Sequence, residues 1–337
     1  MKNRYGENFR IEIFGASHAP EIGVVIEGLE PGTKIDIPRL REFLLRRAPG
    51  RDALSTSRRE PDEPEFTEGV DGGVVVGKTV KAVIRNVNFR SGDYVLNVPR
   101  PGHADYPAAV KYARALDMAG GGPFSGRMTA PLCIAGGIAV QLLAERGVKI
   151  CARAVRIGGE TVEERMKAAI ASARDEGDSV GGIIECTVSG LPVGVGEHMF
   201  YGMENRISGA VFAIPAVKGI EFGAGFAVSE MKGSENNDAY RIAENGAVRT
   251  LSNNAGGILG GMTNGEDVVF RVAVKPTPSI FKPQKSIDLD TMTNVEFSVK
   301  GRHDPCIVLR AVPCVEAAAA VAVYDALVEY DKEGGAQ

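Results

Sequence analysis

Short segments of the chain alternate apolar and polar residues, which is the period-two pattern of strands with one buried face. The pattern predicts a first strand at residues 9–14 and a second at 22–28. Residues 74–76 and 80–84 are predicted to pair as a hairpin around Gly77. Four further strand candidates follow, at residues 148–156, 182–188, 216–222 and 268–274.

Two longer segments, residues 129–146 and 313–330, are apolar on nearly every side. A helix of that kind must be covered all round by the rest of the protein. The second is predicted to begin at Pro313, because proline is favoured in the first turn of a helix. Together these elements predict an α+β fold with buried helices sandwiched between sheets. Residues 1–330 are expected to form a single domain, and 331–337 a frayed tail.

Composition narrows the possible functions of this 337-residue chain. Its net charge is -4 and aromatic residues make up 6%, with no tryptophan, which argues against a general role in binding nucleic acids or membrane surfaces. No apolar signal segment opens the chain, and residues 128–144, its most membrane-like run, are short for a span. Five cysteines without a CxxC pair are typical of free thiols in a reducing compartment. We therefore expect a soluble, cytoplasmic protein.

Arginines are concentrated in one segment of this acidic chain. The segment is polar and contains proline, so residues 48–62 are predicted to form a mobile loop. A local basic cluster indicates either a specific anionic ligand or a solvated basic face, and the pattern leaves both open. The cluster consists of Arg46, Arg47, Arg51, Arg58 and Arg59.

Three of the four histidines stand beside serine, aspartate or arginine, namely His18, His103 and His303. The pKa of a histidine side chain is ~6.5, so a histidine beside such polar groups suits proton transfer at neutral pH. The fourth, His198, has no such neighbours and is predicted to be structural.

The same segments leave a metal-dependent hydrolase open as an alternative, because imidazole and carboxylate groups bind metal ions. No HExxH or CxxC spacing supports it, and the adjacent Arg100 and Arg302 would repel a cation. We expect no metal. The candidate ligands would be His18, His103, Asp105, His303 and Asp304.

Glycine-rich loops are the candidates for binding phosphate. Residues 120–122 run straight into a predicted buried helix, whose N-terminus favours an anion. Residues 256–261 form a second such loop, although close packing of helix and sheet would also explain either one. Residues 275–279 (KPTPS) combine a cation, hydroxyl groups and a rigid backbone. A nominal Walker A match at residues 72–79 lacks the preceding strand and the following helix of a P-loop.

Taken together, these segments resemble the chorismate synthase family nearly end to end. The matching motifs are GASHA (15–19), RRAPG (46–50), SRREPDEPEF (57–66), RSGDY (90–94), RPGHADY (100–106), GGGPFSGR (120–127), AVKGIEFGAGF (216–226), GSEN (233–236), SNNAGGILGG (252–261), KPTPS (275–279) and GRHDPC (301–306).

The resemblance implies a reaction, a cofactor and an assembly. The family eliminates phosphate from 5-enolpyruvylshikimate 3-phosphate to give chorismate, a 1,4-elimination without net redox change that nevertheless requires reduced FMN. Some members reduce the flavin themselves with NADPH, and others depend on the cell. The family fold places buried helices between antiparallel sheets, and its members assemble as homotetramers. A substrate with two carboxylates and a phosphate would account for the local arginines.

The resemblance also implies roles for individual residues. His18 is expected to protonate the leaving phosphate, His103 to hold the reduced flavin in its productive charge state, and Asp304 to assist removal of the ring proton. His303 is left with a structural role. The substrate anions are expected to be bound by Ser17, Arg47, Arg100, Arg127 and Arg302. The FMN site is expected to include Ser125, Glu235, Asn236, Gly260, Lys275, Pro276, Thr277, Pro278 and Ser279, with Arg302 contacting both ligands.

Four segments depart from the family pattern. The common GESHG is GASHA here, so Ala16 and Ala19 flank the Ser–His pair. Many members have a second loop arginine near the position that Ala53 occupies here. The usual RSSAR is PFSGR at 123–127, and the histidine of SNHAGG is replaced by Asn254. These changes leave open a second alternative, a non-catalytic relative that binds flavin or phosphate.

Overall fold

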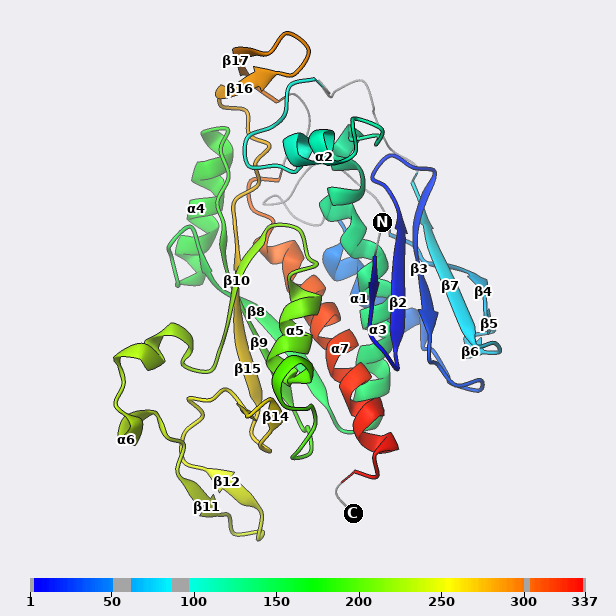
Figure 1. Cartoon of the computed structure of the whole chain (residues 1–337), viewed down its shortest axis with the longest axis vertical. Coiled ribbons are helices and arrows are strands. Elements are labelled where there is room, and N and C mark those ends of the chain that lie inside the picture. The colour runs from blue at the N-terminus through cyan, green and yellow to red at the C-terminus, as the bar shows by residue number, and fades with distance from the viewer. Residues whose placement is uncertain (1–2, 51–61, 87–96, 300–303, 336–337) are drawn as a thin grey trace.

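The computed structural model describes residues 3–50, 62–86, 97–299 and 304–335, and contains two antiparallel sheets around a pair of long helices (Figure 1). The first sheet has the order β1-β2-β3-β7-β4 and comprises β1 (Arg4–Tyr5), β2 (Arg10–Gly15), β3 (Glu21–Glu27), β7 (Thr79–Arg85) and β4 (Glu65–Glu68). The second has the order β10-β15-β9-β8 and comprises β10 (Val217–Phe222), β15 (Val268–Val274), β9 (Gly182–Ser189) and β8 (Lys149–Ile157).

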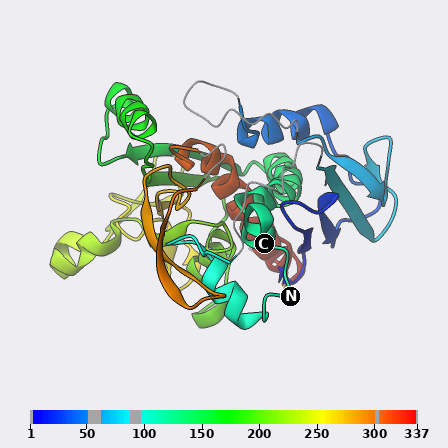
Figure 2. The same cartoon turned by 90° about the horizontal axis from the view of Figure 1, so that it is seen from above.

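The two long helices, α3 (Thr129–Glu145) and α7 (Val308–Lys332), lie between the sheets (Figure 2). Helix α3 packs on β3 and β7 of the first sheet, and α7 on β8 and β9 of the second. The predicted α+β fold, with buried helices between antiparallel sheets, is thus confirmed. The helical segment Gly126–Glu145, which includes α3, and helix α7 are apolar and long enough to cross a membrane, but 83% of the apolar window of each is buried inside the protein. Here they are core helices.

Small side chains let α3 and α7 approach each other closely. A Cβ built on Gly136 of α3 would lie 2.3 Å from the Cα of Ala317 in α7, closer than any real contact. Both helices begin at the same end of the molecule, because Thr129 and Ile307 line the same cavity there. Glycine at this contact therefore sets the spacing of the two N-terminal ends.

Shorter elements surround this core. The helices are α1 (Ile37–Arg47), α2 (Asp105–Lys111), α4 (Glu163–Asp175), α5 (Met203–Val211) and α6 (Gly233–Asn236). The hairpins are β5 (Val70–Asp71) with β6 (Val74–Val75), β11 (Tyr240–Ile242) with β12 (Val248–Thr250), β13 (Ile258–Leu259) with β14 (Met262–Thr263), and β16 (Gln284–Asp288) with β17 (Thr293–Phe297).

The predicted hairpin around Gly77 is wrong. Strand β6 pairs with β5, while β7 pairs with β3 and β4 in the large sheet. The tight turn lies earlier in the chain, between β5 and β6, at Gly72 and Gly73, whose φ angles of 55° and 82° suit a two-residue hairpin turn. Because the nominal Walker A segment forms this hairpin and then enters β7, its dismissal as a P-loop is confirmed.

Helix α7 begins before its predicted start. It opens at Val308, so that Pro313 lies inside the helix rather than at its first residue. A proline there removes one backbone hydrogen bond and is tolerated near a helix N-terminus more readily than in its middle. At the other end α7 continues to Lys332, two residues into the segment expected to fray, and Asp331 forms an ion pair with Arg146.

Candidate active site

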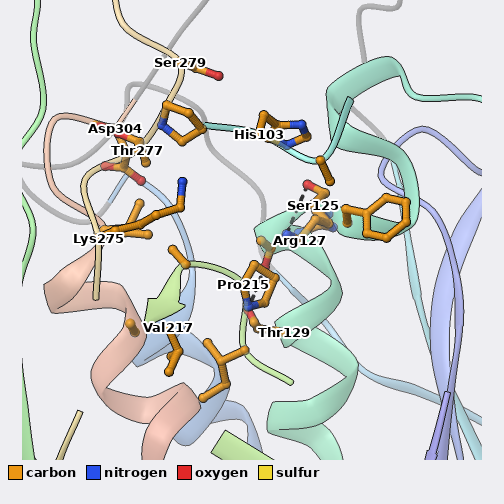
Figure 3. A pocket seen from close by; sticks show the side chains of 18 of the residues that line it. His103, Ser125, Arg127, Thr129, Pro215, Val217, Lys275, Thr277, Ser279 and Asp304 are labelled. Carbon is orange, nitrogen blue, oxygen red and sulfur yellow. Dashed lines mark hydrogen bonds between the residues drawn. The ribbon is translucent and has the colours of Figure 1, made fainter. Parts of the chain in front are cut away.

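The N-terminal ends of α3 and α7 border a cavity of about 610 Å³, within the range of small-molecule sites, which is roughly 300–1,000 Å³. Figure 3 shows His103 and Ser125 on one side of it and Lys275 and Thr277 on the other. In the described part of the chain its lining has a single acidic side chain, Asp304. Six basic side chains line it, namely Arg47, Arg100, Arg127, Lys218, Lys275 and Arg310. This cavity is therefore suited to an anionic ligand.

The glycine-rich loop lies between two histidines. Gly120, Gly121 and Gly122 all have positive φ angles, of 63°, 90° and 51°, in a region that other residues rarely adopt. A Cβ on Gly120 would lie 2.6 Å from Nε2 of His18, and one on Gly121 would lie 3.2 Å from Nε2 of His103. A side chain at either position would therefore crowd Nε2 of a histidine, and the positive φ angles likewise favour glycine there.

Asp105, at the start of α2, orients His103. Its Oδ1 lies 2.6 Å from Nδ1 of His103, and the same carboxylate accepts from Nε and Nη2 of Arg100 at 2.7 and 2.8 Å. Burial raises the pKa of Asp105, but hydrogen bonds from Arg100 and His103 outweigh it and lower the pKa below its usual range. An ionised Asp105 makes Nδ1 of His103 the donor, which leaves Nε2 as the atom presented to the glycine loop.

Two pocket arginines share one buried carboxylate. Asp62, whose side chain is 0% exposed, accepts from Nη1 of Arg47 at 2.6 Å and also from Nη1 of Arg127. Both arginine side chains are themselves only 4% exposed. Because a buried charge is stable only when it is paired, Asp62 fixes the two guanidinium groups side by side.

Asn86 connects these arginines to the loop that carries His18. Its Oδ1 accepts from Nε of Arg127 at 3.0 Å, and its Nδ2 donates to the carbonyl of Ala19 at 2.6 Å and to that of Ser17 at 3.3 Å. Ala16 and Ala19, which depart from the family pattern, thus lie in a turn that Asn86 holds through backbone carbonyls and not through the side chains of the turn.

Asp304, the residue after His303 in the chain, is buried at the edge of the cavity. Its carboxylate accepts from Nη1 of Arg310, and its carbonyl accepts from the hydroxyl of Thr277 at 2.8 Å. Arg310 in turn donates through Nε to the carbonyl of Arg47 at 3.1 Å. Asp304 thus lies in a network that ties the start of α7 to the KPTPS segment and to the end of α1.

The KPTPS segment follows β15 and contributes a cation and two hydroxyl groups. The Lys275 amine donates to the carbonyl of Gly102 at 2.6 Å. Burial lowers the pKa of Lys275, and the nearby Lys218 lowers it further. The Ser279 hydroxyl accepts from Nη1 of Arg100 at 3.2 Å. Two ammonium groups that repel each other would be stabilised by an anion between them.

Known proteins are similar to this chain over nearly their whole length. A sequence profile described as chorismate synthase matches residues 9–328. The chain belongs to the chorismate synthase family. Chorismate synthases of Lancefieldella parvula and Korarchaeum cryptofilum are each 42% identical to it, and the alignments cover 99% and 95% of this chain and 98% and 96% of those proteins. A crystal structure of chorismate synthase superposes with a TM-score of 0.76 at 26% identity, over 98% of this chain and 94% of the other.

Membership of the chorismate synthase family makes the metal-dependent hydrolase the less favoured alternative. The Asp105 carboxylate also accepts hydrogen bonds from the cationic Arg100 side chain, a partner that does not favour a metal ion at this carboxylate. Within the described residues, no group of three or more His, Cys, Asp or Glu side chains could hold a metal ion. His303 and Arg302 lie outside the described residues, as do Arg51, Ala53, Arg58 and Arg59.

The predicted site residues divide into two groups. Ser17 is close to the cavity, since a Cβ on Gly120 would lie 2.7 Å from its Oγ, and Pro276 lies within the KPTPS segment. Most of the others line the cavity, namely Arg47, Arg100, His103, Ser125, Arg127, Lys275, Thr277, Pro278, Ser279 and Asp304.

Glu235, Asn236 and Gly260 are not brought to this cavity within the chain. The first two end α6, and the third lies in the turn between β13 and β14, both far from the pocket end of α3 (Figure 1). Asn254, the residue that replaces the family histidine, donates to the carbonyls of Glu235 and Asn236 at 3.3 and 3.1 Å. The departure at Asn254 thus belongs to this outlying region.

His198 lies on the surface, with its side chain 78% exposed and Nδ1 3.2 Å from the Glu197 carboxylate.

In the PFSGR segment, which departs from the family pattern, Ser125 caps a helix. Its hydroxyl accepts from the backbone N–H of Arg127 at 3.3 Å, at the start of the short helix η3 (Gly126–Met128).

Four functional residues were missed by the sequence reasoning, namely Asp62, Asn86, Lys218 and Arg310. Asp62 stands at the end of the arginine-rich segment, where an acidic residue among arginines was a usable signal. For Asn86 and Lys218 no local pattern marks the residue, because their contacts come from segments distant in the sequence.

Proposed function

We propose that this chain converts 5-enolpyruvylshikimate 3-phosphate into chorismate and phosphate with the aid of reduced FMN. The observation that carries the proposal is the lining of the cavity, where six basic side chains face one acidic side chain. A substrate with two carboxylates and a phosphate matches that charge. Family membership supports the same reaction.

Arg47, Arg100 and Arg127 bind the substrate anions in this proposal, together with Ser17 and Arg302. Arginine presents a planar fork that fits carboxylate and phosphate oxygens at two points. Asp62 and Asp105 already fix one edge of these guanidinium groups. The substrate therefore meets donors whose orientation is set before it binds, which lowers the entropic cost of binding.

FMN fits the other side of the cavity. Lys275, Thr277 and Ser279 offer an ammonium group and two hydroxyls for its phosphate, and the lowered pKa of Lys275 indicates a cation that an anion would stabilise. Reduced FMN, when bound, supplies the electron-rich ring on which the family's elimination depends. Ser125, Pro276 and Pro278 complete this part of the proposed site, and Glu235, Asn236 and Gly260 remain proposed flavin contacts although they lie elsewhere in the chain.

Two histidines move or hold protons. His18 gives a proton from Nε2 to the departing phosphate, which leaves more readily as a less charged species. His103 is oriented by its contact with Asp105 and keeps the flavin in its productive charge state. Asp304, kept beside Arg310, is the carboxylate that assists removal of the ring proton.

Assembly and location are proposed by analogy with the family. We propose a cytoplasmic homotetramer that acts on a small molecule and has no nucleic-acid or membrane partner.

An anaerobic assay tests the function. The chain is incubated with 5-enolpyruvylshikimate 3-phosphate, with reduced FMN in one arm and with oxidised FMN or a divalent metal in the others. We expect chorismate only in the arm with reduced FMN. Turnover that needs metal and no flavin would point to the hydrolase, and flavin binding without turnover would point to a non-catalytic relative.

A further inference from the structure

Two thiols that the proposed reaction does not use meet at the wall of the cavity. Cys133 of α3 and Cys314 of α7 have their Sγ atoms 3.9 Å apart. Each stands three residues before the close contact of Gly136 with Ala317. Because the two helices start at the same end, that contact also brings the preceding turns, and hence the thiols, together.

The two thiols differ in their position relative to the cavity. Both are buried, but Cys314, at 3% exposed, is among the residues that line the cavity, whereas Cys133, at 0% exposed, is not. A small molecule that enters the cavity therefore reaches Cys314 first. The Sγ of Cys133 remains in contact with the Sγ of Cys314 and with the carbonyl of Pro313, each at 3.9 Å.

The two thiols also differ in acidity. A hydrogen bond from Cys133 lowers the pKa of Cys314, burial raises it, and the positive charges of Arg47 and Arg310 lower it, so that the pKa falls below its usual range. Burial raises the pKa of Cys133. Since the thiolate is the reactive form, Cys314 is the nucleophile of the pair and Cys133 is its neutral neighbour.

We propose that Cys133 and Cys314 form an oxidisable dithiol, which a small hydroperoxide entering the cavity converts into a disulfide. The Cys314 thiolate attacks one peroxide oxygen and the O–O bond breaks, giving a sulfenic acid, and the released hydroxide takes up a proton to become water. Cys133 then attacks the sulfenyl sulfur. The S–S bond forms, the S–O bond breaks, and the Cys133 proton leaves with the hydroxide as a second water. Two thiols and one hydrogen peroxide thus give one disulfide and two waters.

The geometry favours this product over further oxidation. A disulfide needs the two sulfurs to close from 3.9 Å by roughly 2 Å, which side-chain rotation and a small helix shift can provide. A resolving thiol in contact with the sulfenic acid intercepts it before more oxygen is added. The bond would join α3 to α7 directly beneath the pocket.

The test uses the full chain and hydrogen peroxide. After brief oxidation, peroxide is removed with catalase, remaining thiols are alkylated, and peptides are mapped by mass spectrometry without reduction. We expect a peptide that links Cys133 to Cys314 and disappears on treatment with dithiothreitol. Oxidation confined to Cys151, the exposed cysteine, would overturn the proposal.

Single substitutions separate the two roles. In Cys133→Ser the sulfenic acid on Cys314 has no partner and should be trapped by dimedone. In Cys314→Ser, oxidation of Cys133 should slow by roughly tenfold or more, because a buried thiol of raised pKa is a poor nucleophile. Equal oxidation of Cys133 in that variant, or no dimedone adduct in Cys133→Ser, would contradict the order proposed.

Cys186→Ser is the matched control, since Cys186 is equally buried and burial likewise raises its pKa. This variant should form the linked peptide at the wild-type rate, and a lost linkage would argue against the pair. Circular dichroism verifies the fold of each variant. Where a serine variant is unfolded, the alanine variant replaces it in the same test.

Discussion

At the scale of single residues, two carboxylates fix the orientation of three arginines and of His103 at the pocket. Asp105 holds Arg100 and His103, and Asp62 holds Arg47 and Arg127. These pairings set the orientation of the groups that would meet the substrate. A substitution at either carboxylate should therefore affect both stability and the binding of anions.

His103→Ala should lower kcat strongly while the protein stays folded. A positioned acid–base group typically contributes roughly 10²–10⁴-fold in rate. The measurement is chorismate formation at saturating substrate and reduced FMN, with thermal unfolding as a check of the fold. His198→Ala, at an exposed histidine, is the control and should leave kcat unchanged. A loss of less than about threefold in His103→Ala would remove His103 from the acid–base roles.

Asp105→Asn should change how stability depends on pH. The pKa of Asp105 is lowered in the folded protein, so its contribution is fully present above the unfolded value of about 3.9 and is lost as the pH falls through the lower folded value. Urea unfolding should show a gap between wild type and variant that is constant near neutrality and shrinks in acid. A gap that stays constant down to pH ~3 would argue against an ionised Asp105.

The control for that series is Asp290→Asn. Its carboxylate is largely exposed and forms an ion pair with Arg114 on the surface. The gap between this variant and wild type should be small at every pH, because exposed ion pairs contribute little.

Asp62→Asn should destabilise the fold by about 3–5 kcal/mol, because it leaves Arg47 and Arg127 buried without their shared charge. Urea unfolding measures the loss, and inorganic phosphate should restore part of it by binding Arg47 and Arg127 from the cavity, which both residues line. Glu163→Gln, at an exposed pair with Lys167, is the control and should leave the midpoint nearly unchanged. A variant as stable as wild type would show that Asp62 does not hold the two arginines.

At the scale of elements, the glycine loop and the N-terminal ends of α3 and α7 shape the cavity. Period-two patterns predicted most strands of the two sheets, and the apolar run predicted α3, with ends mostly correct to one or two residues. The pattern failed at the β5–β6 hairpin, because valines on both sides of Gly77 looked like partners while β7 was needed inside the large sheet. It also failed at the start of α7, since a proline inside a helix resembles one at its beginning.

Gly120→Ala should abolish most activity, since its Cβ would lie 2.6 Å from Nε2 of His18 and its φ angle is 63°. Gly72→Ala is a matched control with a φ angle of 55° and no heavy atom within 4 Å. Each should cost stability of roughly 1 kcal/mol from backbone strain, measured by urea unfolding. Activity should fall only in Gly120→Ala. An equal effect on turnover in both variants would mean that backbone strain, and not the clash with His18, is the cause.

At the scale of the whole molecule, the sequence motifs predicted most of the residues that line the cavity, but not how the fold brings them together. Motifs from α1, the glycine loop, the KPTPS segment and α7 converge because the two sheets hold α3 and α7 in parallel, and no local pattern carries that arrangement. Asn86 and Lys218 were missed for the same reason, whereas Asp62 carried a local signal in the arginine-rich segment. The flavin roles of Glu235, Asn236 and Gly260, and the single domain over residues 1–330, stay predictions.

The stoichiometry of a single turnover tests the proposed elimination most directly. Enzyme with reduced FMN is mixed anaerobically with a limiting amount of 5-enolpyruvylshikimate 3-phosphate, and chorismate, phosphate and the flavin spectrum are recorded together. We expect chorismate and phosphate in equal amounts and a flavin that is reduced at the end as at the start. Phosphate without chorismate, or a flavin left oxidised in proportion to product, would contradict a redox-neutral elimination in this pocket.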